Sequence, residues 1–176
     1  LHHIAEIATG LGTTAPISLR VNPDVDPKTH PYISTGLKES KFGIPMDQAL
    51  QLYRTAQTLT GIAIKGIDCH IGSQITQLAP YLDALDKMFE LIDQLADQGI
   101  ALEHFDIGGG MGVRYEQEPD FPLQALSDAL QQKMADRDLR VILEPGRYII
   151  ANAGVLLTEV LYTKHNATRA FAVVDA

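Results

Sequence analysis

The sequence predicts an α/β protein with a parallel sheet, followed by the start of an antiparallel β element. Two observations support this prediction. Short apolar runs rich in β-branched residues alternate with longer segments of helical period, which is the pattern of repeated βα units. After Arg147 the alternation stops, and two strand-like segments follow one another with no helix between them. We therefore expect a βα domain over residues 1–150 and the beginning of a β domain over residues 151–176.

The parallel sheet is expected to contain four apolar strands, at residues 17–21, 62–71, 102–107 and 140–143. Three helices are expected between them, at residues 47–60, 78–98 and 122–134. The first two are amphipathic, because their apolar residues recur at spacings of three and four. Gly61 and Gly99 follow these two helices, where a left-handed C-cap favours glycine. The antiparallel element is expected to pair residues 155–162 with residues 169–174.

Charge and composition argue against two classes of partner. The chain has 176 residues and a formal net charge of -8, spread without a basic block, so nucleic acid is not expected to bind. No apolar stretch approaches the ~20 residues of a membrane span. The single cysteine, Cys69, has no disulfide partner within the chain, and we expect a cytoplasmic protein. Because many α/β barrels have ~250 residues and Leu1 falls within a helical pattern, we also expect an internal part of a longer protein.

Three polar or glycine-rich clusters each follow the carboxyl end of a predicted strand. They are His-Ile-Gly-Ser-Gln at residues 70–74, Asp-Ile-Gly-Gly-Gly-Met-Gly at residues 106–112, and Glu-Pro-Gly-Arg at residues 144–147. Ligands bind at this edge of parallel α/β folds. The coincidence of three clusters at one edge therefore predicts a ligand site there.

The run Gly108, Gly109 and Gly110 is typical of an anion site. Glycines let the backbone approach a ligand closely and aim several N–H groups at one anion, so a phosphate is the expected guest. A Rossmann motif starting at Gly108 is excluded because Val113 stands where the last glycine belongs, and no Gly-Lys-Ser/Thr follows for a P-loop. The alternative is a tight turn between strand and loop.

Strand parity places Asp68 and His70 on one face of the second strand and Lys65 and Cys69 on the other. We expect the first pair to face the ligand edge and the second pair to face the helices. A lone histidine there is more often a hydrogen-bonded core residue. The nearby Ser73 and the glycines favour a ligand contact instead.

Glu144 ends an apolar strand, where a carboxylate is costly to desolvate without a partner. Arg147 could be that partner. Alternatively, Glu144 faces a ligand cation while the guanidinium of Arg147 grips a carboxylate or phosphate. The residue types leave both interpretations open.

The clusters resemble those of the alanine-racemase-fold decarboxylases, which include diaminopimelate, ornithine and biosynthetic arginine decarboxylases. They occur in the family's order and at similar separations, and the resemblance extends over nearly the whole chain. Within the family, the chain is most similar to the diaminopimelate decarboxylases. Four further segments carry that similarity, at residues 19–25, 30–36, 40–44 and 151–156.

The resemblance implies a (β/α)8 TIM barrel of the alanine-racemase type, running into a C-terminal β domain, with pyridoxal 5'-phosphate (PLP) at the mouth of the barrel. His70 would stack on the cofactor ring, Glu144 would meet the pyridine nitrogen, and Arg147 would lie beside the phosphate and the substrate. No metal is implied. The implied cofactor-binding residues are His70, Ser73, Gly108, Gly109, Gly110, Glu144, Pro145, Gly146 and Arg147.

The implied reaction is the decarboxylation of meso-2,6-diaminopimelate to L-lysine by a homodimer with shared active sites. Two alternatives are another basic amino-acid decarboxylase and a non-catalytic homologue that regulates one. The family's Schiff-base lysine lies on an early barrel strand upstream of these residues, so the chain alone is expected to be inactive. By resemblance Lys41 belongs to the dimer contact, and its alternative is a solvated loop lysine.

Overall fold

A computed structural model describes residues 1–27 and 41–176 of the chain. The segment at residues 30–36 and Ser40, both used in the family resemblance, lie outside the described residues.

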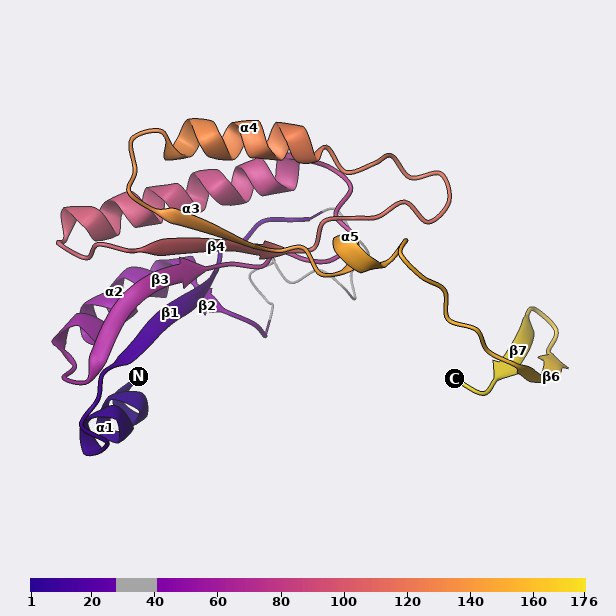
Figure 1. The fold of residues 1–176 in the computed structure, drawn as a ribbon, viewed down its shortest axis with the longest axis horizontal. Coiled ribbons are helices and arrows are strands. Elements are labelled where there is room, and N and C mark those ends of the chain that lie inside the picture. Colours follow the sequence, from indigo (N-terminus) through magenta and orange to yellow (C-terminus); the bar gives the residue numbers. More distant parts are fainter. Residues whose placement is uncertain (28–40) are drawn as a thin grey trace.

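The described residues form an α/β fold around one parallel sheet (Figure 1). The strands are β1 (Ala15–Asn22), β2 (Ile44–Pro45), β3 (Ile62–Asp68), β4 (His104–Gly109) and β5 (Arg140–Glu144), in the spatial order β2-β1-β3-β4-β5. All neighbouring pairs are parallel. The helices packed with them are α1 (His2–Gly10), α2 (Met46–Thr58), α3 (Ala79–Asp97) and α4 (Leu123–Met134).

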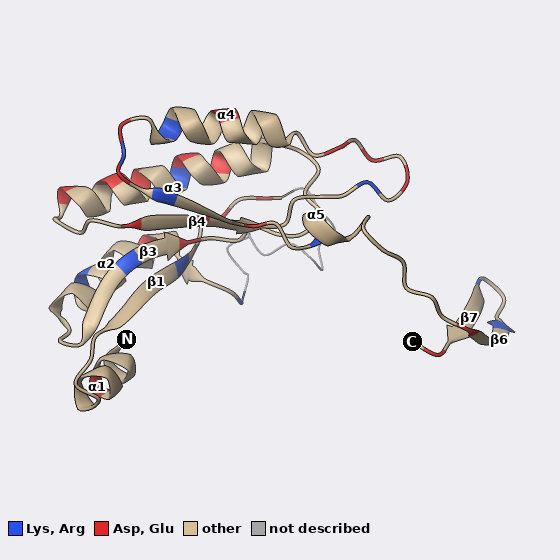
Figure 2. Cartoon of the chain, in the orientation of Figure 1, with Lys and Arg blue, Asp and Glu red and all other residues tan. Residues whose placement is uncertain are grey.

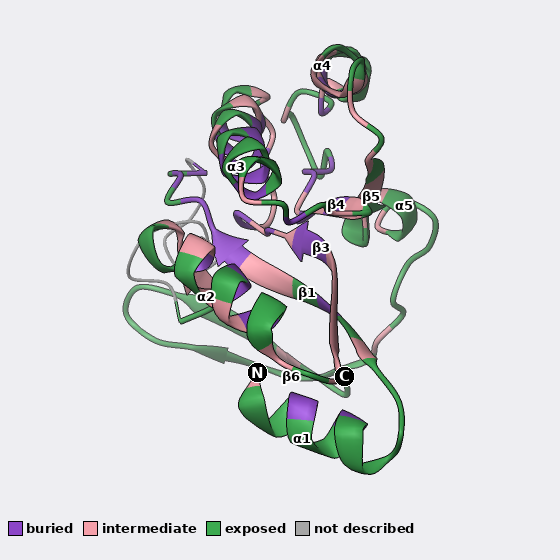
Figure 3. Cartoon of the chain, turned by 90° about the vertical axis from the view of Figure 1, so that its left-hand side faces the viewer, coloured by how far each residue is buried: buried purple, intermediate pink, exposed green. Residues whose placement is uncertain are grey.

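The strand order identifies the architecture. Apart from the two-residue β2, the strands lie side by side in chain order, without the reversal that marks a doubly wound sheet. Figure 3 shows α2, α3 and α4 on the same side of the strands. A parallel sheet with sequential strands and helices on one face is the wall of a (β/α) barrel. The predicted fold class is confirmed.

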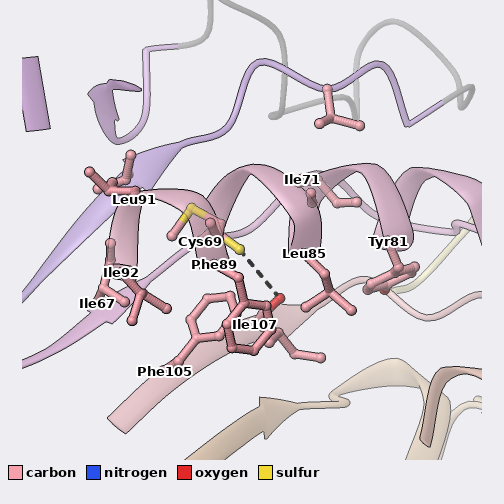
Figure 4. Packing of buried hydrophobic residues seen from close by; sticks show 14 of the residues in the cluster. Ile67, Cys69, Ile71, Tyr81, Leu85, Phe89, Leu91, Ile92, Phe105 and Ile107 are labelled. Carbon is pink, nitrogen blue, oxygen red and sulfur yellow. Dashed lines mark hydrogen bonds between the residues drawn. The ribbon is translucent and has the colours of Figure 1, made fainter. Parts of the chain in front are cut away.

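The apolar core lies between the sheet and these helices. Side chains of β3 and β4 that point outward meet the amphipathic face of α3, where Phe105 packs edge-to-face on Phe89 with ring centroids 5.5 Å apart (Figure 4). Ile67 and Phe105 are both 0% exposed, and burying a side chain of this size stabilises a fold by ~1.5–3 kcal/mol. The core therefore fixes which face of each strand points away from the helices.

The opposite face of the sheet is polar. The hydroxyl of Ser18 on β1 donates to Asp68 on β3 at 3.1 Å, and the ring of His104 on β4 lies against Gly66. Polar side chains on one face and apolar ones on the other are what the period-two alternation of a strand produces.

Boundaries of the parallel strands and their helices differ from the prediction by at most three residues. The strand expected at 62–71 ends at Asp68, because the chain leaves the ladder after Cys69, whose N–H still donates to the Asp106 carbonyl at 3.0 Å. β4 begins two residues later than expected and continues to Gly109. Sequence periodicity did not reveal β2 or the one-turn helix α5 (Arg147–Ile150), since both are too short to show a period.

The C-terminal residues form the expected antiparallel pair, β6 (Val160–His165) and β7 (Ala170–Val174). β6 begins at Val160 and not at residue 155, because Val155, Leu156 and Leu157 are 84–97% exposed and pair with no strand among the described residues. Figure 1 shows the hairpin well away from the parallel sheet.

β5 is an edge strand. An apolar groove of about 700 Å³ lies between it and α4, lined by Leu126, Leu130 and Leu143 among others. Acidic and basic residues are interspersed over the helices and loops (Figure 2). In the two described segments, none of the helices has both the length and the apolar content needed to cross a membrane.

Candidate active site

The three predicted clusters meet at the carboxyl edge of the sheet. The N–H of Gly109, at the end of β4, donates to Nδ1 of His70, in the loop after β3, at 3.3 Å. Arg147, the first residue of α5 after β5, donates through Nη2 to the Ser73 hydroxyl at 2.8 Å. Residues far apart in the chain thus form one continuous site, as expected from the shared edge of parallel strands.

Close packing of neighbouring backbones explains the glycine run. Gly108 and Gly110 have φ values of +72° and +92°, which disfavour other residues. A Cβ on Gly108, Gly109 or Gly110 would overlap a carbonyl oxygen of Cys69, Glu144 or Gly72, respectively. The turn between strand and loop therefore already requires glycine at all three positions. The phosphate role of the run stays a prediction.

Hydrogen bonds from neighbouring segments hold the glycine run in place. A carboxylate oxygen of Asp106 accepts from the N–H of Gly108 at 2.8 Å, and the Gly110 carbonyl accepts from the N–H of Ile75 at 2.9 Å. The carbonyl of Gly109 accepts from the hydroxyl of Tyr81 on α3 at 2.8 Å. These bonds fix the direction of each peptide in the run.

His70 lies on the polar face, as parity predicted. Its neighbour Cys69 is 3% exposed and packs toward the helices, while His70 is half-buried beside the glycines. Burial lowers the pKa of His70, and the charge of Arg20 acts in the same direction, whereas Glu144 and Asp106 oppose it. Because Nδ1 accepts the Gly109 N–H, the neutral ring carries its proton on Nε2.

A pH titration of stability tests whether folding lowers the pKa of His70 and so favours its neutral ring. A folded pKa below the unfolded value of about 6.5 means that the unfolded chain binds more protons between these two values. The contribution of His70 to the free energy of unfolding should therefore be fully present above its unfolded pKa. It should be lost as pH falls through its folded pKa. We expect the free energy of unfolding to fall more between pH 7 and pH 5 in the wild type than in His70→Gln. A proton on Nδ1 in ¹⁵N NMR spectra at neutral pH is the contrary result.

Glu144 and Arg147 do not form the ion pair that was one of the two interpretations, within the residues that the structure describes. Glu144 is exposed, so the desolvation cost expected at the end of an apolar strand does not arise in this structure. Arg147 contacts Ser73 and, at 3.4 Å, Oε1 of Gln74. Pro145 and Gly146 form the turn between them, with Gly146 at φ +43°.

Sequence reasoning missed the roles of Gln74 and Arg20. The amide of Gln74 donates to the Val113 carbonyl at 2.7 Å and accepts the Val113 N–H at 3.2 Å, which joins two of the loops. Gln74 has φ +57°, an uncommon value for a residue with a side chain. Arg20 is half-buried on the polar face, and the central carbon Cζ of its guanidinium lies 5.4 Å from the centroid of the Phe42 ring. Both residues stood in the recognised motifs, but their partners come from other loops.

Two lysines have identifiable surroundings. Lys65 pairs with Glu103 at the opposite end of the sheet, so parity correctly placed it away from the site. Nζ of Lys41 lies 5.0 Å from the centroid of the neighbouring Phe42 ring. This contact tests neither interpretation of Lys41.

The site brings together groups suited to a planar, phosphorylated ligand. A hydroxyl and a guanidinium beside the glycine run can bind a phosphate dianion, since charge-assisted hydrogen bonds are the strongest in proteins. An imidazole in the loop after β3 and a carboxylate at the end of β5 lie beside them. The donor set therefore fits a cofactor that carries a phosphate and a basic ring.

Comparison with known proteins gives the class. Residues 1–151 match the model of the family described as pyridoxal-dependent decarboxylase, pyridoxal binding domain. The chain belongs to the pyridoxal-dependent decarboxylase family.

Within that family, the chain is similar to diaminopimelate decarboxylases. That of Pseudomonas aeruginosa is 53% identical over 176 residues, which are 100% of this chain and 42% of the relative. The crystal structure of the Helicobacter pylori enzyme complexed with L-lysine has a TM-score of 0.87 and 42% identity, over 98% of this chain and 43% of that one. A structure of SrLDC in complex with PLP and cadaverine has a TM-score of 0.70 and 30% identity, over 98% and 42%. The chain spans less than half the length of each relative.

Proposed function

We propose that the full-length protein uses PLP to decarboxylate meso-2,6-diaminopimelate to L-lysine. The observation that carries the proposal is the bond from Arg147 to Ser73, which joins α5 to the loop after β3 beside the glycine run. The identity of 53% to a diaminopimelate decarboxylase and the likeness to a homologue complexed with L-lysine support the substrate.

In this proposal, Ser73, the glycines Gly108–Gly110 and Arg147 bind the phosphate of PLP. Pro145 and Gly146 shape the loop that presents Arg147. The fit rests on the convergence of the Ser73 hydroxyl and the Arg147 guanidinium beside the glycine run at one edge of the sheet. Fixing the phosphate this way anchors one end of the cofactor and leaves its reacting end exposed to substrate.

His70 and Glu144 act on the ring. When bound, PLP supplies an electron sink for the electron pair left behind as carbon dioxide departs. The Glu144 carboxylate favours a proton on the pyridine nitrogen, because an adjacent negative charge stabilises the protonated form. A neutral His70 ring can stack on the face of the cofactor at low desolvation cost.

The remaining parts of the site are proposed to come from outside residues 1–176. The chain covers 42% of the curated relative, and Lys65 is held at the opposite end of the sheet, so we assign the lysine that anchors PLP to the rest of the protein. We also propose that the protein is a cytoplasmic homodimer with shared active sites, and that residues 151–176 begin a β domain. The chain by itself is then expected to be inactive.

A second candidate is decarboxylation of another basic amino acid, favoured by the likeness to SrLDC in complex with PLP and cadaverine. Assaying carbon dioxide release by the full-length protein with meso-diaminopimelate, ornithine, arginine and lysine distinguishes the two. We expect activity with meso-diaminopimelate. Activity with one of the other three alone overturns the substrate, and activity with none supports the regulatory alternative.

A further inference from the structure

Gln74 connects the loop after β4 to Arg147. Its Oε1 accepts from the N–H of Val113 at 3.2 Å and from Nη1 of Arg147 at 3.4 Å. Its Nε2 donates to the Val113 carbonyl at 2.7 Å. An amide oxygen has two lone pairs, so Oε1 can accept both bonds at once. The half-buried side chain of Gln74 thus links an exposed guanidinium to the backbone of a neighbouring loop.

The Val113 end of this link is held firmly. The N–H of Ile75 donates to the Gly110 carbonyl, and the N–H of Gly112 donates to the Ile75 carbonyl, both at 2.9 Å. Val113 comes next and is 5% exposed. The amide of Gln74 bonds to both backbone groups of Val113, as a peptide of a neighbouring strand would. Oε1 therefore has a defined position from which to accept the guanidinium.

The backbone of Gln74 is strained. Its φ of +57° lies in the left-handed region, which glycine adopts freely and which disfavours residues with a Cβ. Such strain persists only where the surrounding structure requires it, and it is concentrated at functional sites. The hydrogen bonds of the amide to Val113 and Arg147 offset the strain. This outlier motivates a functional role for the side chain.

Arg147 is anchored through its neighbour and exposed at its own side chain. Tyr148 packs edge-to-face on Phe121 with ring centroids 6.3 Å apart, which holds α5 against the buried layer. The guanidinium then donates through Nη2 to Ser73 and through Nη1 to Gln74. One bond alone leaves the guanidinium free to turn about that contact. Bonds from both terminal nitrogens fix the direction of its plane.

This arrangement leaves donors for an anion. A guanidinium has no acceptor, so the Ser73 oxygen must be the acceptor of their bond, and the hydroxyl hydrogen is available to a different group. The guanidinium also carries more N–H groups than these contacts use. Donors that are already oriented bind an anion more tightly, because less conformational entropy is lost on binding.

We propose that Gln74 is a positioning residue that holds the guanidinium of Arg147 in the orientation that binds the phosphate of PLP. This inference rests on the proposed function and deepens it. Gln74 acts through Arg147 and contacts neither cofactor nor substrate. An amide clamped on one loop thereby sets the strength of anion binding by a residue of another.

The chain contains a matched control. Oε1 of Gln98 accepts from Nε of Arg54 on α2 at 2.6 Å. Gln98 ends α3 shortly before β4 begins, so this bond lies toward the opposite edge of the sheet from the site. Replacing either glutamine with methionine removes an amide that accepts from an arginine and keeps an unbranched side chain of similar length.

The test compares PLP with pyridoxal, which lacks the phosphate, by spectrophotometric titration of full-length apoprotein. For Gln74→Met we expect the dissociation constant for PLP to rise roughly 3- to 10-fold and that for pyridoxal to change less than about twofold. Gln98→Met should bind both ligands as the wild type does. Equal weakening of both ligands in Gln74→Met, or unchanged PLP binding, overturns the proposal.

A double-mutant cycle separates the positioning of Arg147 from general support of the loop. In an Arg147→Met background, Gln74→Met should change the dissociation constant for PLP by less than about twofold, because the group that it positions is gone. The same loss in both backgrounds would assign Gln74 to the structure of the loop or to Ser73, and the proposal would then be wrong.

Gln74→Gly covers the case in which the methionine variant does not fold. Glycine adopts the positive φ without strain and removes the amide, so the same weakening of PLP is expected. PLP binding as tight as that of the wild type contradicts the role of Gln74. Failure of the proposed function looks different, because Arg147→Met would then bind PLP as the wild type does, and the inference would fall with it.

Discussion

Replacing Gly109 with alanine is expected to destabilise the full-length protein by ~2–4 kcal/mol and to abolish PLP binding. The added Cβ would overlap the carbonyl oxygen of Glu144 and lie 2.9 Å from its carbonyl carbon. Backbone lies on both sides of the overlap, so no side-chain rotation relieves it. The ends of β4 and β5 must separate, which moves Arg147 away from Ser73. Urea unfolding and PLP titration measure the two effects.

Gly154→Ala is the control for this variant. A Cβ at Gly154 meets nothing within 4 Å among the described residues. Surface substitutions of this kind usually change stability by less than ~0.5 kcal/mol. If the Gly109 and Gly154 variants were equally stable and bound PLP equally, the close approach of the two strand ends would not be present in the full-length protein.

Glu144→Gln is expected to lower kcat by about 10²–10³-fold while leaving the fold intact. Glutamine keeps the size and one acceptor oxygen but removes the charge that favours a proton on the pyridine nitrogen. Because Glu144 is exposed and forms no ion pair with Arg147, the substitution should not change the midpoint of urea unfolding. Steady-state decarboxylation with meso-diaminopimelate measures the loss.

Glu103→Gln is the matched carboxylate-to-amide change. It breaks an exposed pair with Lys65 at the opposite end of the sheet, where an ion pair contributes ~0–1 kcal/mol. We expect its kcat to equal that of the wild type. A Glu144→Gln enzyme within threefold of wild-type kcat would falsify the role assigned to that carboxylate.

The fold was largely predictable because the signals that define it are local. In α3 the spacing of three and four identified Leu85, Phe89, Ile92 and Leu95, all buried, although Leu82 is only half-buried and Tyr81 takes the inner position of the first turn. Strand ends were less predictable, since the end of a ladder depends on where the neighbouring strand stops. β3 illustrates this, because apolar residues continue past its last pair.

The site was predictable as a location but not as a set of contacts. The three clusters could be assigned to one edge because parallel strands share their carboxyl ends. The sequence could not show that backbone carbonyls of neighbouring segments fill the space beside each glycine. Nor could it show that the guanidinium of Arg147 donates to Ser73 and forms no ion pair with Glu144 among the described residues. Gln74 and Tyr81 were missed because an amide or a buried hydroxyl shows no partner until the loops are in place.

The chain-order arrangement of β1, β3, β4 and β5 also bears on how the protein forms during synthesis. Each strand and helix can dock on the unit made just before it, because each of these strands pairs with the strand of the preceding βα unit. Translation supplies ~5–20 residues per second, while helices form within about a microsecond and parallel strands pair more slowly. The wall can therefore assemble on the ribosome one unit at a time. The edge of the newest strand is then the surface that chaperones must protect until its next neighbour emerges.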